Sequence, residues 1–211
     1  MKRALAPIFA ALLLSGCSFF GVRSGYEQPA YEIVDRLGPE LEVRRYGPRL
    51  AAEVAVESDD YGEGQDAAFR VLFDYITGAN RTQAKIEMTV PVETNTASEE
   101  IAMTAPVETE RTEDGRTRMR FFLPGAYDLA SAPEPEDPRV RIVRLSAQTF
   151  AVLRFSGFGR KGDVAAKTAE LTAALEASPW RPAAAPTSYF YDPPWTLPFL
   201  RRNEVAVAVE R

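Results

Sequence analysis

The sequence of 211 residues contains no histidine and only one cysteine, Cys17. The missing histidine excludes Ser-His-Asp and Cys-His catalytic groups, histidine zinc sites and histidine-ligated haem. The single cysteine excludes an intrachain disulfide, a thiolate zinc cluster and a Cys-x-x-Cys redox pair. The rest of the composition, 45% apolar and 26% charged, is that of a globular protein with one sizeable core or two small ones.

The first sixteen residues predict a cleaved secretory signal. Lys2 and Arg3 precede an apolar run that is shorter than the roughly 20 residues of a membrane span. The run ends in Leu-Ser-Gly-Cys at 14–17, which resembles the bacterial lipobox, whose cysteine is acylated when the signal is removed. An inert core cysteine is the alternative, but the Lys-Arg start favours lipidation of Cys17.

Lipidation implies a protein that is tethered to a membrane without spanning it, because several acyl chains at one residue give stable anchoring. By resemblance to Gram-negative sorting signals, Ser18 favours the outer membrane, with the protein facing the periplasm. We therefore expect a lipoprotein signal at 1–16, the lipidated cysteine and a tether at 17–30, and one domain at 31–211. Without the signal, 23 basic and 30 acidic side chains leave a net charge of −7, which makes nucleic acid and anionic lipid headgroups poor partners for the surface as a whole.

Alternating apolar and polar residues predict strands in ten segments. These are 31–37, 41–46, 50–57, 84–92, 101–109, 117–123, 139–145, 149–156, 188–192 and 203–210. Helical spacing appears instead at 66–77 and at 163–177, the second with Asp163 as its expected N-cap. The order strand pair, helix, strand pair occurs twice, so the sequence predicts an α+β fold of two similar halves that share one core.

A near-copy of nine residues, IEMTVPVET at 86–94 and IAMTAPVET at 101–109, is identical at seven positions. The plainer interpretation is a hairpin of similar strands whose methionines and valines fill the core, with prolines at bulges or edges. The alternative is that Met88 and Met103 form an adaptable wall for a flat apolar ligand. The residues alone favour the first interpretation.

The order of motifs along the chain resembles that of the SOUL family of haem-binding proteins. The motifs are YEIVDRLGPELEVRRYGPRLAAEV, FRVLFDYITGAN, the two Met-Thr-x-Pro-Val copies, RFFLPGAY, PEDPRVRI, RFSGFG and LPFLRRNEVAVAVE. The resemblance covers about residues 31–210. It implies a distorted antiparallel β-barrel with two flanking helices, and non-covalent binding of haem, protoporphyrin or a related tetrapyrrole.

Within that family, a chain without histidine resembles the members that bind through an apolar cleft. The residues expected to line the cleft are Phe69, Leu72, Phe73, Ile76, Met88 and Met103, each of which has plain core packing as its alternative. Four cations are candidate partners for haem propionates, because their donors match carboxylates: Arg44, Arg45, Arg81 and Lys85. Most surface cations are simply solvated.

Three functions remain open on the sequence. The first is a tethered binding protein for tetrapyrroles, and the second is an envelope scaffold or small-molecule-binding lipoprotein with no tetrapyrrole role. The third, a hydrolase, is disfavoured because no nucleophile motif, metal-ligand spacing or phosphate loop is present. We therefore expect a binding protein and not an enzyme.

The apolar loop 193–200 has two interpretations of its own. It is either a partner or membrane contact, or a structural lead into the last strand. The structural interpretation is favoured, with Arg and Glu of the segment 201–204 expected to pair.

Overall fold

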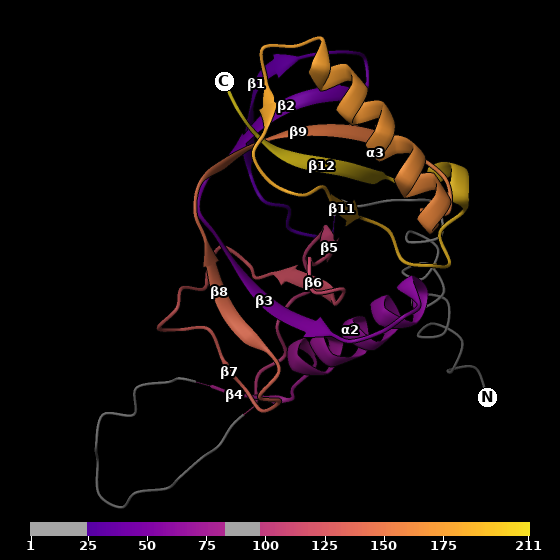
Figure 1. The fold of residues 1–211 in the computed structure, drawn as a ribbon. Coiled ribbons are helices and arrows are strands. Elements are labelled where there is room, and N and C mark those ends of the chain that lie inside the picture. Colours follow the sequence, from indigo (N-terminus) through magenta and orange to yellow (C-terminus); the bar gives the residue numbers. More distant parts are fainter. Residues whose placement is uncertain (1–24, 83–97) are drawn as a thin grey trace, which may run out of the picture.

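The alternating segments pair into one curled antiparallel sheet, as described for residues 25–82 and 98–211 in a computed structural model (Figure 1). Its strands are β1 (Tyr31–Arg36), β2 (Leu41–Tyr46), β3 (Arg49–Val56), β5 (Val107–Arg111), β6 (Thr117–Phe122), β8 (Arg141–Leu145), β9 (Gln148–Phe155), β10 (Arg181–Pro182), β11 (Thr187–Phe190) and β12 (Asn203–Glu210). They lie in the order β1-β2-β9-β12-β11-β5-β6-β3-β8, with β10 on β12. Two short strands, β4 (Asn80–Arg81) and β7 (Glu134–Pro135), form a separate ladder, and a 3-10 turn, η1, spans Pro198–Leu200.

Two helices cover one face of this sheet. Helix α2 (Tyr61–Ile76) packs on β3 and β6, and helix α3 (Lys161–Glu176) packs on β9 and β12. The strand register shows that both helices lie on the same face of the sheet, because side chains at paired positions point to the same face. Val205, in the core cluster of α3, stands opposite Ser188, and Ser188 stands opposite Thr109. Thr109 in turn stands opposite Met119, in the core cluster of α2. The opposite face therefore carries no helix among the described residues.

The expected two halves appear in the strand order. The units β3-α2-β5-β6 and β9-α3-β11-β12 lie on either side of the β5–β11 pair, where Glu108 stands opposite Tyr189. The strand that precedes each unit in sequence pairs with the other unit: β2, which precedes β3, pairs with β9, and β8, which precedes β9, pairs with β3. The α+β fold with two flanking helices is confirmed, and the sheet is curled as a half-barrel.

Several predicted boundaries are wrong, for local reasons. Helix α2 begins five residues before the predicted Asp66, because the Asp60 carboxylate accepts hydrogen bonds from Gly62 N at 2.8 Å and Glu63 N at 3.0 Å. Helix α3 begins at Lys161, so Asp163 is its third residue and not its N-cap; its carboxylate accepts from Arg160 N at 3.1 Å.

The repeated motif also departs from the prediction. The second copy becomes a strand only from Val107, after an irregular stretch that contains the cis Ala105–Pro106 peptide. The whole first copy, with the strand predicted at 84–92, lies outside the described residues, as do the signal and Cys17. The other predicted strands are present with ends that differ by at most about two residues.

Candidate functional site

A cavity with a volume of about 430 Å³ opens where Arg49 and Phe122 of the helix-free face meet the loops at the end of the sheet. Three backbone segments surround it: residues 27–30, the β2–β3 turn at 47–50, and residues 122–127 after β6, with Thr104 beside them. Ligand cavities of small-molecule-binding proteins fall in this range of volumes.

Hydrogen bonds between these segments hold the cavity open. Leu123 N donates to Leu50 O at 2.9 Å, and Gly125 N donates to a Glu27 carboxylate oxygen at 2.8 Å. Ala105 N donates to Glu27 O at 3.0 Å, which joins the N-terminal segment to the loop before β5. The walls are thus fixed by backbone contacts between parts of the chain that are far apart in sequence.

Arg49, the first residue of β3, lines the cavity with its guanidinium among aromatic rings. Its Cζ lies 4.6 Å from the ring centroid of Tyr46, 5.0 Å from Phe122 and 5.6 Å from Phe150. The rings attract the cation and fix its position. Its Nε is buried without a hydrogen-bond partner, and among the described residues no ion pair joins Arg49 to a carboxylate.

Tyr189 places a second unpartnered donor beside this arginine. Both residues line a small adjoining space of about 10 Å³, room for at most one water. The Tyr189 side chain is fully buried, and its hydroxyl lies against the Arg49 guanidinium without a hydrogen bond of ordinary geometry, which leaves its O–H group without an acceptor. Burial raises the pKa of Tyr189, so the hydroxyl stays protonated and remains a donor at neutral pH. Buried donors without partners are rare, and Arg49 Nε, whose residue lines both spaces, and the Tyr189 hydroxyl, whose residue lines only the smaller one, together indicate a place for an acceptor.

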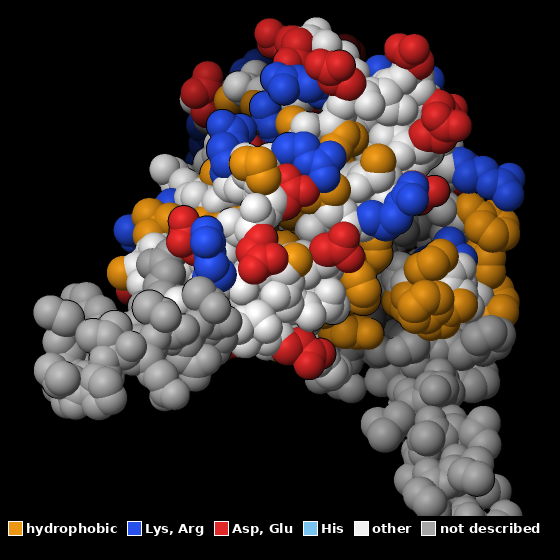
Figure 2. Space-filling view, turned by 90° about the horizontal axis from the view of Figure 1, so that it is seen from below, with side chains coloured by type: hydrophobic (Ala, Val, Ile, Leu, Met, Phe, Trp, Pro, Cys, Tyr) orange, Lys and Arg blue, Asp and Glu red, His pale blue; other side chains and the backbone are white. Residues whose placement is uncertain are grey.

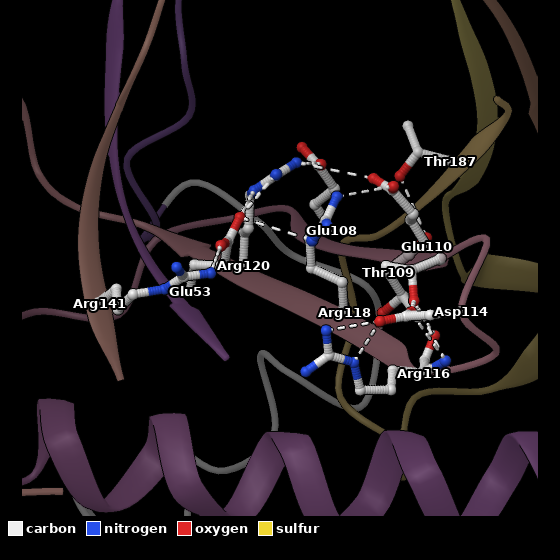
Figure 3. Close-up of polar contacts among 11 residues, drawn as sticks. Glu53, Glu108, Thr109, Glu110, Asp114, Arg116, Arg118, Arg120, Arg141 and Thr187 are labelled. Atoms are coloured by element: carbon white, nitrogen blue, oxygen red, sulfur yellow. Dashed lines mark hydrogen bonds and ion pairs between the residues drawn. The ribbon is translucent and has the colours of Figure 1, made fainter. Parts of the chain in front are cut away.

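The buried carboxylates of the helix-free face are paired within the protein. In the ladder shown in Figure 3, Arg120 bonds Glu53 on β3 through Nε at 2.8 Å and Glu108 on β5 through Nη1 at 2.5 Å. Burial raises the pKa of Glu108, against the lowering effect of Arg120. On the other flank, Glu204 accepts from Arg44 Nη1 at 3.0 Å. These groups hold strands together and are not free for a ligand.

The predicted apolar residues lie on the opposite, α2 side of the sheet. Leu72 and Ile76 are fully packed in the α2 core, and Met103 is half-buried against the same cluster. Phe69 stacks on Phe73 with centroids 5.8 Å apart, and the Phe73 side chain is 43% exposed. Met88 lies outside the described residues. As a ligand surface these residues remain a prediction.

The predicted cations are dispersed. Arg44 is buried and bonded to Glu42 and Glu204, while Arg45 and Arg81 are exposed and paired with Glu32 and Glu134. Lys85 lies outside the described residues. Sequence reasoning missed Arg49, because its neighbours in space come from β2, β6 and β9 and no local pattern joins them.

Comparison with known proteins identifies the family. The SOUL heme-binding protein family matches residues 26–208. The chain belongs to this family. Heme-binding protein 1 of Bos taurus is 26% identical over 162 residues, which are 73% of this chain and 75% of the bovine protein. Heme-binding protein 2 of Homo sapiens is 36% identical over 69 residues, 31% of this chain, so that match spans only 34% of the human protein.

Solved structures show the same fold at low sequence identity. The C-terminal domain of EcmrR has a TM-score of 0.54 and 11% identity, with 86% of this chain and 98% of that domain covered. A hydrolase from Listeria innocua has a TM-score of 0.51 and 11% identity, with 81% and 92% covered. At this identity the likeness of this SOUL-family chain to both concerns the fold alone.

The cavity offers few groups that could ligate iron. Tyr127 is its one described tyrosine on the wider wall, and burial together with its hydrogen bond to Glu99 raises the pKa of Tyr127 to about 12, so the phenol is protonated at neutral pH. In the described ranges, no group of three or more His, Cys, Asp or Glu is placed to hold a metal. No helix within those ranges is long and apolar enough to cross a membrane.

Proposed function

We propose that this SOUL-family protein is a lipid-anchored protein of the cell envelope that binds haem or a related tetrapyrrole in the cavity of the helix-free face. The observation that carries the proposal is Arg49, held among three aromatic rings at a cavity of about 430 Å³ in a chain of a haem-binding family. The relatives named for haem binding support the class of ligand.

The residues present fit a tetrapyrrole with free carboxylates. The half-buried Leu50, together with Pro29, Pro48 and Pro124 of the wall, provides apolar surface for the macrocycle. Removing such a ring from water contributes about 25 cal/mol per Å² of apolar area. The unpartnered donors of Arg49 and Tyr189 fit a carboxylate oxygen, which would satisfy both.

The affinity for a tetrapyrrole is expected to depend little on whether the ring contains iron. The chain has no histidine, and Tyr127 is protonated, so neither supplies a strong axial ligand. Haem and iron-free protoporphyrin should therefore bind within about tenfold of each other, a difference of roughly 1.4 kcal/mol. Protein starting at Ser18, which keeps every described element, can be titrated with both and followed by absorbance.

Two exposed positions distinguish the cavity from the α2 surface. Ala30→Trp fills the cavity mouth, while Phe73→Ser removes the exposed ring of α2. We expect Ala30→Trp to weaken both porphyrins at least about tenfold, because the bulky ring displaces the macrocycle, and Phe73→Ser to leave affinity unchanged. The reverse result would place the ligand on the α2 surface. If neither porphyrin binds saturably at micromolar concentration, the scaffold function replaces this one.

The tether is the second part of the proposal. Leu-Ser-Gly-Cys after a Lys-Arg apolar start supports acylation of Cys17, and Ser18 supports the outer membrane. Cys17→Ser is expected to leave unprocessed precursor and abolish labelling by a fatty-acid probe. Labelling that survives the substitution would rule the anchor out.

A further inference from the structure

Three exposed aromatic side chains form one surface patch beside the last strand. Phe199, Trp195 and Phe158 are 71%, 61% and 53% exposed, the highest values among the large hydrophobic side chains of the described residues. Figure 2 shows hydrophobic side chains gathered at the margin of the molecule where η1 lies in Figure 1. We call these three residues the aromatic patch.

Arg201 assembles the aromatic patch from two loops. Its guanidinium lies 5.3 Å from the Phe158 ring centroid, and its Nε donates to Thr196 O at 2.8 Å. Gly157 N donates to Pro198 O at 2.9 Å, which fixes the Phe158 loop against η1. The backbone of the two loops is therefore ordered by its own hydrogen bonds, while the three rings stay largely exposed.

Cations surround the aromatic patch. Arg160 lies 4.6 Å from the Phe158 ring centroid, and exposed Lys161 follows it at the start of α3. The nearby carboxylates of Asp163 and Asp192 are engaged, with Arg160 N and Arg202 N respectively. Aromatic rings rimmed by arginine and lysine match a membrane interface, where rings enter the headgroup region and cations stay in water.

The N-terminal segment reaches the domain next to this patch. Gln28 accepts a hydrogen bond from Arg202 Nη1 at 3.5 Å, one residue along the chain from Arg201. Ten residues lie between Cys17 and Gln28 in the sequence, so the chain from one to the other spans at most about 40 Å when extended. An anchor at Cys17 therefore keeps Gln28, and with it the domain, within about 40 Å of the bilayer, a span that lets the aromatic patch reach the surface.

We propose that the aromatic patch docks on the surface of the membrane to which Cys17 is anchored. This proposal rests on the lipid anchor of the proposed function. The patch alone is small, so its affinity for a bilayer is low, but the tether supplies a high effective concentration of membrane. Docking fixes the orientation of the domain, and with it the direction in which the cavity opens.

The two tryptophans of the chain provide the test. Trp195 is exposed, whereas Trp180 is 7% exposed, donates its Nε1–H to Asp35 at 2.9 Å and lies under Arg211. Acylated mature protein, which starts at Cys17, is reconstituted into vesicles of phosphatidylethanolamine and phosphatidylglycerol, with and without bromine on the acyl chains. We expect brominated lipid to reduce the Trp195 emission about twofold and leave Trp180 unchanged. Trp195→Phe identifies which residue is quenched.

A matched pair of variants tests the patch itself. Phe158→Ser with Phe199→Ser should reverse most of the quenching of Trp195, because both flanking rings are lost. Leu129→Ser, a change at a side chain that is 52% exposed and outside the patch, should leave quenching as in the wild type.

The outcomes separate the anchor from the docking. Protein that floats with the vesicles but whose Trp195 is quenched by aqueous iodide and not by brominated lipid overturns the docking alone. Protein that is not acylated and does not float with the vesicles overturns both the anchor and the docking that rests on it.

Discussion

Arg44 and Arg45, two neighbouring arginines of β2, differ in burial and in ion pairing although they are adjacent in sequence. Glu204 is 0% exposed and accepts from Arg44 Nη1 at 3.0 Å, from Tyr191 Oη at 2.8 Å and from Arg202 Nη2 at 2.7 Å. Arg45 points to the other face, is exposed, and meets Glu32 at 3.3 Å. One arginine is thus part of a buried ionic network, and the next is a solvated surface charge.

Replacing these arginines one at a time should give very different losses of stability. Arg44→Met leaves Glu204 buried with one donor fewer and is expected to lower the free energy of unfolding by about 3 kcal/mol. Arg45→Met removes only an exposed pair and should cost less than about 1 kcal/mol. Urea unfolding of both variants measures the difference. Equal losses would contradict the assignment of Arg44 to the buried network.

The sequence could not separate these roles. Both arginines are flanked alike, and the alternation of β2 shows only that they face opposite sides. Which of the two sides is buried depends on Glu204, which is 160 residues away along the chain. The aromatic neighbours of Arg49 also come from three strands that are distant in sequence, so no local pattern indicates its role. By contrast, pairing of Arg202 with Glu204 is local and was predictable, and it is confirmed at 2.7 Å.

At the scale of elements, the two helices occupy equivalent positions in the topology, but they differ in the space left around a glycine near the start of each helix. Gly64, the fourth residue of α2, has no room for a side chain, since an added Cβ would lie 2.5 Å from Thr117 Oγ1 on β6. Gly162, the second residue of α3, has nothing within 4 Å of the same added atom. Close approach of α2 to β6 therefore depends on one glycine.

Alanine at each glycine tests this difference. Gly64→Ala should lower the free energy of unfolding by about 1–3 kcal/mol, because helix or strand must move apart. Gly162→Ala should leave it unchanged or raise it by up to about 1 kcal/mol through helix propensity. Thermal and urea unfolding provide the values. A Gly64→Ala protein as stable as the wild type would mean that α2 does not pack this closely.

The sequence predicts the presence of most helices and strands better than it predicts their first and last residues. Alternation and helical spacing indicate β1, β2, β6, β12 and the C-terminal end of α2, because these follow from residues close in sequence. The start of α2 was missed because Asp60 caps it from outside the apolar pattern. The loop before β5 was read as strand because a copied motif suggests a copied structure, whereas residues 101–106 instead meet the segment around Glu27.

At the scale of the whole molecule, buried tyrosines set the response to alkaline pH. Burial is the largest cause that raises the pKa of each of six phenols: Tyr46, Tyr61, Tyr75, Tyr127, Tyr189 and Tyr191. The unfolded chain releases these protons near pH 10, while the folded chain retains them. The unfolded state therefore binds fewer protons above pH 10, and stability falls as pH rises.

We expect the free energy of unfolding to be nearly constant from about pH 8 to 9.5 and to decrease from about pH 10 towards 12. Urea unfolding at a series of pH values, with tyrosinate absorbance recorded on the folded protein, measures both quantities. Tyr127→Phe should remove part of the decrease, because the pKa of Tyr127 is about 12 in the folded state. Phenols that ionise near pH 10 in the folded protein, with no loss of stability, would contradict this burial.

The central claim joins these scales: a family fold presents a cavity with Arg49 in its wall and Tyr189 in the small space behind it, and the Arg49 guanidinium receives a carboxylate of a tetrapyrrole. The most direct measurement compares protoporphyrin with its dimethyl ester, which has the same macrocycle and no carboxylate, on wild-type protein and on Arg49→Met. A charge-assisted hydrogen bond of about 1.5–3 kcal/mol predicts that the wild type binds the free acid at least about tenfold more tightly than the ester. Arg49→Met should lose that preference and bind both equally. Equal affinities of the wild type for acid and ester, or a preference that survives Arg49→Met, would contradict the account.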